Sequence, residues 1–153
     1  MTEREEWDVV LRPHRTPMFV YGAALTIAAV HIAIGFLLKV GSTGVVFQTS
    51  DQVAMALLGL VLAGVVLLFA RPRLRIGAAG ISVRNLLGDK LIEWPDVAGV
   101  SFPVGNRWAR IDLPDDEYIP VMAIQAVDKD RAVNAMDTVR SLLARYRPDL
   151  HTH

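Results

Sequence analysis

Two long apolar runs dominate the first half of the chain, Met18 to Leu38 and Gln52 to Ala70, and neither contains an acidic or basic residue other than His31. At a rise of about 1.5 Å per residue, a helix of either length is about long enough to cross a hydrocarbon core of roughly 30 Å. The pattern predicts two transmembrane helices, residues 17–40 and 52–70, joined by a short external loop, residues 41–51. Thr16 and Pro17 suit the start of the first helix, and Ser50 or Asp51 can cap the second.

Small residues recur at helical spacing on both apolar runs. They form one face of each predicted helix, and such faces let helices approach closely in lipid. The sequence therefore predicts an antiparallel hairpin packed through these positions: Tyr21, Ala24, Ala28, His31 and Gly35 on the first helix; Ala56, Gly59, Ala63 and Ala70 on the second.

Basic residues concentrate at the outer ends of the two runs, whereas only Lys39 lies near the connection. By the positive-inside bias, both termini are expected in the cytoplasm and the protein in the cell's inner membrane. The arginines concerned are Arg4, Arg12, Arg15, Arg71, Arg73 and Arg75.

After the second run the pattern changes to an alternation of apolar and polar residues broken by turn residues, which is typical of an antiparallel meander. The expected turns are at residues 77–80, Gly88-Asp89, Pro95-Asp96, residues 105–106 and residues 114–117; Pro120 favours an edge strand. Asp128 is expected to cap a helix that ends before Pro148. Its apolar face comprises Ala132, Met136, Val139, Leu143 and Tyr146. This order predicts an α+β domain at residues 71–148, followed by a tail at 149–153.

The N-terminal segment, residues 1–16, has two interpretations. Trp7 to Leu11 alternates with period 2, which indicates a short strand that joins the sheet of the C-terminal domain. The alternative is a disordered or interfacial tail.

Composition excludes several classes of protein. The chain has 16 Lys and Arg against 16 Asp and Glu and no cysteine, so neither a nucleic-acid-binding face nor a disulfide framework is expected. No Gly-rich phosphate loop, G-x-S-x-G elbow or H-E-x-x-H motif occurs. We therefore expect neither an enzyme nor a cofactor or metal site.

Three segments in order carry a family resemblance: GISVRNLLG at 80–88, EWPDV at 93–97 and RWARIDL at 107–113. They resemble the bacterial pleckstrin-homology-like (PH-like) domains of small actinobacterial two-helix membrane proteins of the low-molecular-weight antigen type. The resemblance implies a partly open antiparallel barrel of two sheets with a C-terminal helix, used for lipid or protein recognition and without catalytic residues. Phosphoinositide-type binding is not expected, because the turn at residues 77–80, taken as joining the first two strands, has no basic residue.

Two sets of residues are candidate recognition sites. If Ala109 and Ile111 face the core, Trp108 is exposed beside Arg107 and Arg110, and tryptophan and arginine are enriched at binding hot spots. The reversed register would place Trp108 in the core. Arg71, Arg73 and Arg75 are expected to orient the hairpin and to attract anionic headgroups.

Other polar residues are expected to be structural. His31 is interpreted as an imidazole bonded to a carbonyl or to another subunit, because the second apolar run contains no Asp, Glu, Lys, His, Ser or Thr with which it could relay a proton. The acidic residues Asp115, Asp116 and Glu117 fit a solvated turn, and His151 and His153 alone are weak grounds for a metal site.

Three functions follow as hypotheses. The first is a non-enzymatic membrane protein that docks a protein partner through its PH-like domain. The second is recognition of anionic lipid headgroups by that domain, and the third is a small transporter or channel subunit that uses His31. Expected partners are membrane lipids and a protein partner. Whether the chain also binds further copies of itself is left open.

Overall fold

The computed structural model describes residues 7–40 and 46–151, and the chain divides into two compact units. One unit is helical and comprises residues 16–70. The other contains the strands and the C-terminal helix, and it is built from the N-terminal residues up to Arg15 together with the chain from Arg71 onward.

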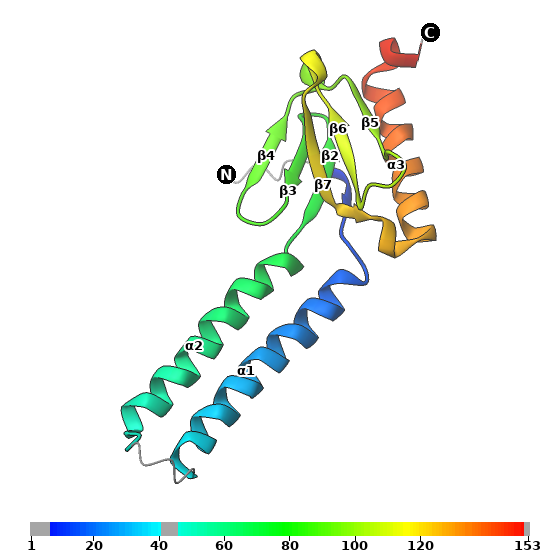
Figure 1. Ribbon diagram of the computed structural model, residues 1–153. Coiled ribbons are helices and arrows are strands. Elements are labelled where there is room, and N and C mark those ends of the chain that lie inside the picture. Colours follow the sequence, from blue (N-terminus) through cyan, green and yellow to red (C-terminus); the bar gives the residue numbers. More distant parts are fainter. Residues whose placement is uncertain (1–6, 41–45, 152–153) are drawn as a thin grey trace. The chain divides into compact units, whose positions relative to one another are not determined.

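The helical unit is a hairpin of α1 (Thr16–Val40) and α2 (Thr49–Leu67), with a 3₁₀ turn, η1 (Leu68–Ala70), after α2 (Figure 1). The second helix begins three residues before its predicted start. Its N-cap is Gln48 rather than Ser50 or Asp51; the carboxylate of Asp51 instead accepts the Gln48 N–H at 2.8 Å. Residues 41–45 of the predicted loop lie outside the described residues.

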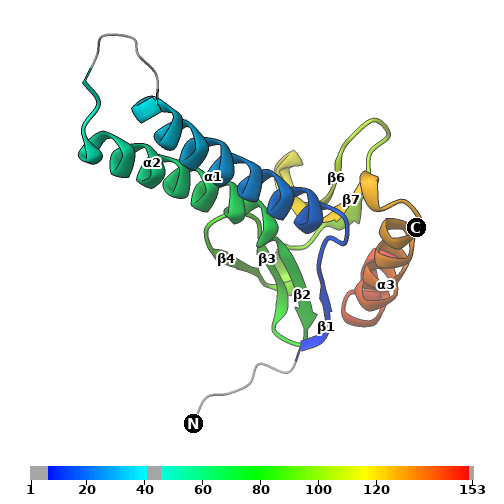
Figure 2. The ribbon, with the colours of Figure 1, turned by 90° about the horizontal axis from the view of Figure 1, so that it is seen from below.

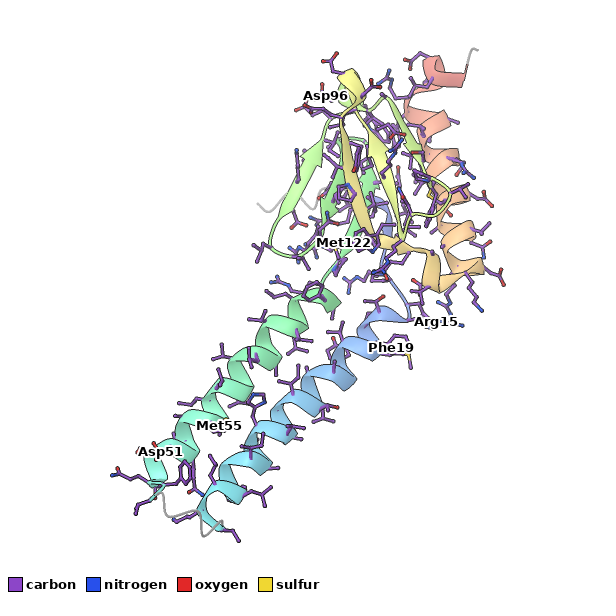
Figure 3. The ribbon with its side chains drawn as sticks, viewed as in Figure 1. Arg15, Phe19, Asp51, Met55, Asp96 and Met122 are labelled. Carbon is purple, nitrogen blue, oxygen red and sulfur yellow. The ribbon has the colours of Figure 1, made fainter. Side chains whose placement is uncertain are left out.

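The two helices pack through small residues, as the spacing predicts. Ala24 and Gly35 of α1 and Gly59 and Ala63 of α2 are buried. Large apolar side chains point outward instead, and Figure 3 shows Phe19 directed away from α2. Tyr21 does not belong to the buried face, because its side chain is 60% exposed.

The other unit contains two antiparallel sheets that are not closed into a barrel (Figure 1). The first sheet has the order β1 (Trp7–Leu11), β2 (Arg73–Gly77), β3 (Gly80–Arg84), β4 (Asp89–Ile92). The second has the order β5 (Gly99–Ser101), β6 (Trp108–Asp112), β7 (Tyr118–Gln125). Pro120 lies on β7, an edge strand, as predicted.

The predicted N-terminal strand exists and joins the sheet, since β1 pairs antiparallel with β2 and Leu11 lies opposite Leu74 (Figure 2). The helical hairpin is therefore inserted between the first two strands of the sheet. The turn predicted at residues 77–80 is confirmed and joins β2 to β3.

The predicted two-residue turn at Gly88-Asp89 is wrong. Arg84 pairs with Asp89, so four residues, 85–88, connect β3 to β4. Asn85 in this loop binds the edge of the other sheet: its Nδ2 donates to the Pro120 carbonyl at 2.9 Å, and its Oδ1 accepts the Met122 N–H at 3.1 Å. The loop thus joins the sheets at an edge where Pro120 has no N–H to offer.

Helix α3 (Asp130–Tyr146) packs its apolar face on the core, and four of the five predicted face residues, Ala132, Met136, Val139 and Leu143, are buried. The fifth, Tyr146, stacks on Trp94 with ring centroids 4.7 Å apart. The centre of the core comprises Leu74, Ile76, Ile81, Val97, Ile111, Val121, Ile124 and Val139.

Asp128 does not cap α3, whose N-cap is Lys129. The Asp128 carboxylate accepts two backbone N–H groups from the segment after β1, that of His14 at 3.0 Å and that of Arg15 at 2.9 Å. These long-range hydrogen bonds satisfy a side chain that is only 8% exposed.

Candidate functional site

The second sheet of the PH-like domain carries two exposed aromatic side chains. Ala109 and Ile111 are each 1% exposed and face the core, so Arg110 and Asp112 of β6 face outward. Trp108 is 37% exposed, and Tyr118, on the adjacent strand β7, is 56% exposed. The register with Trp108 outward is therefore the correct one. We call Trp108, Arg110 and Tyr118 the tryptophan face.

Arg110 is held in place on this face by three contacts. Its Nε donates to the Ser101 hydroxyl at 3.0 Å and lies 2.8 Å from the Asp112 carboxylate, and its guanidinium lies over the Tyr118 ring, 5.0 Å from the centroid. The side chain is thus ordered before any partner binds. Arg107 has an exposed side chain, and its carbonyl accepts the Ala126 N–H at 2.9 Å.

The second group of charged residues is an arginine cluster on the first sheet: Arg73, Arg75 and Arg84 around Asp89. The N···O distances from Asp89 are 3.1 Å to Arg73, 3.5 Å to Arg75 and 2.6 Å to Arg84. Partial burial alone would raise the pKa of the Asp89 carboxyl group, but hydrogen bonds from Arg84 and Arg73 and their charges hold that pKa below its ordinary value.

The predicted role of Arg73 and Arg75 as membrane-proximal cations therefore needs refinement. Both are strand residues with an internal acidic partner, and Arg75 also lies over the Trp7 ring at 4.8 Å from its centroid. Arg71, outside the strand, has an exposed side chain.

In the helical hairpin, His31 Nδ1 donates to the Ile27 carbonyl of the same helix at 2.8 Å, which is one of the two arrangements predicted for it. The ring also packs where α2 has no side chain, since a Cβ on Gly59 would lie 2.4 Å from the His31 Cβ. A hydrogen bond crosses between the helices, from Gln52 Nε2 to the Gly35 carbonyl at 3.0 Å.

The acidic residues 115–117 form the turn predicted for them. Asp115 and Asp116 are exposed and adopt positive φ angles of 61° and 60°. Within residues 7–40 and 46–151, no three His, Asp or Glu side chains come together in a way that could hold a metal ion. His153 lies outside the described residues.

The sequence analysis missed Tyr118, Arg84 and Asp89. Period-2 alternation of β7 could have placed Tyr118 on the outer face beside Arg110. The pairing of Arg84 with Asp89 could not be found, because it depends on a four-residue loop where the Gly-Asp dipeptide indicated two.

Comparison with known proteins agrees with this architecture. Residues 71–142 match the family described as bacterial PH domain. Over 145 residues the chain is 79% identical to uncharacterized protein Mb1452 of Mycobacterium bovis and to uncharacterized protein Rv1417 of Mycobacterium tuberculosis, covering 95% of this chain and 94% of each relative. No solved structure matches. The match and the two-sheet fold with its C-terminal helix show that residues 71–142 form a domain of the bacterial PH domain family.

Proposed function

We propose that this protein is a non-catalytic membrane protein whose PH-like domain docks a protein partner through the tryptophan face. The observation that carries the proposal is the immobilised Arg110, which lies over the exposed Tyr118 ring and shares strand β6 with the exposed Trp108. Arginine, tryptophan and tyrosine are the residue types most enriched at the hot spots of protein interfaces. A side chain that is already ordered loses less conformational entropy on binding.

The two apolar helices support the membrane part of the proposal. Both are long and apolar enough to cross a membrane, and only 11% of the most apolar segment of each is buried. A core helix of a soluble protein would bury most of that surface.

The order of the elements along the chain supports the placement of both ends of the hairpin on the same side of a membrane. Strand β1 leads into α1 and strand β2 follows η1, and these strands are hydrogen-bonded neighbours. If the helices span a bilayer, both ends of the hairpin emerge on the side of the PH-like domain. The arginines at these ends favour the cytoplasm for that side.

Photo-crosslinking in mycobacterial cells tests the docking surface in the full chain. Tyr118 is replaced by benzoylphenylalanine, which keeps an aromatic ring on the tryptophan face, and the expected result is a discrete adduct with one protein. Adding Trp108→Ala should abolish that adduct. Adding Leu87→Ala, which removes an 80% exposed side chain from the β3–β4 loop, should not. The absence of a discrete adduct, or an adduct that survives Trp108→Ala, would contradict docking through Trp108 and its neighbours.

A further inference from the structure

We propose that a pocket of the PH-like domain, lined in part by the chain segment that precedes α1, binds the phosphodiester group of an anionic glycerophospholipid. The pocket, here the junction pocket, has a volume of about 260 Å³ and lies between the segment after β1, the end of β7 and the first turns of α3. Its apolar lining includes Leu11, Ala123 and Ile124, and its polar lining includes Arg12, Arg131 and Asn134. This volume is just below the range of about 300–1,000 Å³ for drug-sized ligands, which suits a headgroup rather than a whole lipid.

The wall of the junction pocket is held by Asp128. The carboxylate of this residue lies in the pocket lining and is fixed by the N–H groups of His14 and Arg15. The segment carrying Arg12 is thereby tied to the start of α3, which carries Arg131. The two guanidinium groups come from residues 119 positions apart in the chain, and one carboxylate fixes the distance between their backbones.

The charge of the lining matches a single negative charge. Arg12 and Arg131 contribute +2 and Asp128 contributes −1, so these three residues together leave +1. Among residues 7–40 and 46–151, neither of these guanidinium groups has a carboxylate partner, whereas Arg73 and Arg84 share Asp89. A phosphodiester carries one negative charge, and arginine binds phosphate oxygens through paired N–H groups.

The position of the junction pocket in the chain favours a lipid as the source of that phosphodiester. His14 lines the pocket two residues before Thr16, the first residue of α1. If α1 spans a bilayer, the polypeptide next to its first residue lies at the depth of the phosphates. The apolar part of the lining would then accept the glycerol carbons next to the phosphate.

Amide NMR shifts of the full chain in zwitterionic detergent test the proposal. The probes are dioctanoyl phosphatidylglycerol, dioctanoyl phosphatidylcholine and the water-soluble diester glycerophosphoglycerol. We expect saturable shifts at Ala132 and Ala135 with phosphatidylglycerol and at least fivefold weaker binding of phosphatidylcholine, whose choline cation the arginines repel. Shifts with glycerophosphoglycerol as well would mean that the phosphodiester itself suffices; shifts with the lipid alone would identify the bilayer as the source.

Matched variants separate the pocket from general charge attraction. Arg131→Gln should weaken phosphatidylglycerol binding at least fivefold. Arg140→Gln, the same change on the same helix outside the junction pocket, should weaken it less than twofold. Ala135→Phe should block binding by filling the volume without a change of charge. Equal losses for Arg131→Gln and Arg140→Gln, or equal binding of the two lipids, would overturn the proposal, and the arginine pair decides even if Ala135→Phe does not fold.

Discussion

The helical hairpin and the PH-like domain sort their side chains in opposite ways. In the domain, large aliphatic residues such as Ile76 and Ile111 are at most 1% exposed. In the hairpin, the buried residues include glycine and alanine, while Leu25 is 72% and Phe36 69% exposed. Large apolar side chains on the outside are stable only where the solvent is itself apolar, and without a hydrophobic driving force the helices must associate through close backbone approach. The hairpin is thus consistent with a membrane environment and the domain with water.

The largest effect on stability is expected when a large aliphatic side chain is truncated to alanine, and the two units should respond differently to this change. Ile76→Ala removes a fully buried side chain from the domain core and should lower the free energy of unfolding by about 2–5 kcal/mol. Leu25→Ala on the outer side of α1 should cost less than about 1 kcal/mol, because detergent or lipid surrounds that side chain. Urea unfolding of the full chain in micelles, followed by fluorescence for the domain and by helical circular dichroism for the hairpin, measures both. Equal losses would contradict the opposite sorting.

A smaller effect is expected from separating the two helices. Gly59→Leu places a side chain where a Cβ would already lie 2.4 Å from the His31 Cβ, so the helices must move apart, at about 1–3 kcal/mol. Gly64→Leu is the matched control, since nothing lies within 4 Å of a Cβ there. Thermal unfolding of the hairpin by circular dichroism should show a lower midpoint for Gly59→Leu only. A similar decrease for Gly64→Leu would show that helix packing is not responsible.

The smallest effect concerns charge in the domain. Because the pKa of Asp89 is lower in the folded chain than in the unfolded chain, its contribution is present above the unfolded pKa of about 4 and is lost as pH falls through the folded value. At about 30% exposure the contribution is on the order of 1 kcal/mol. Asp89→Asn should therefore destabilise the domain at pH 7 and flatten its decline in stability below pH 4.

The control for this change is Asp137→Asn, which removes an acidic residue whose side chain is 65% exposed beside Arg140. Urea unfolding at pH 7 and pH 3 compares the two variants with the unmodified chain. If both variants lose stability equally, the arginine cluster has no special role in the fold.

The candidate sites divide according to the distance over which their contacts act. Outward exposure of Trp108 was one of two alternatives that the alternation along one strand allowed, and the burial of Ala109 and Ile111 selected it. The roles of Asp89 and Asp128 could not be predicted from any one strand or helix. The pairing of Asp89 with Arg84 depends on the length of the loop between β3 and β4. The role of Asp128 depends on hydrogen bonds to residues 113 and 114 positions away.

The sequence by itself determined the two apolar helices with their small contact faces, the strands of the meander and the amphipathic face of α3. These features repeat with a local period and follow from the burial of one side of one element. Only the tertiary structure decided that the hairpin interrupts the first sheet, that Asn85 joins the two sheets, and that Asp128 fixes the wall of the junction pocket. These contacts join elements from distant parts of the chain, and no local pattern determines which buried polar group will satisfy which distant donor.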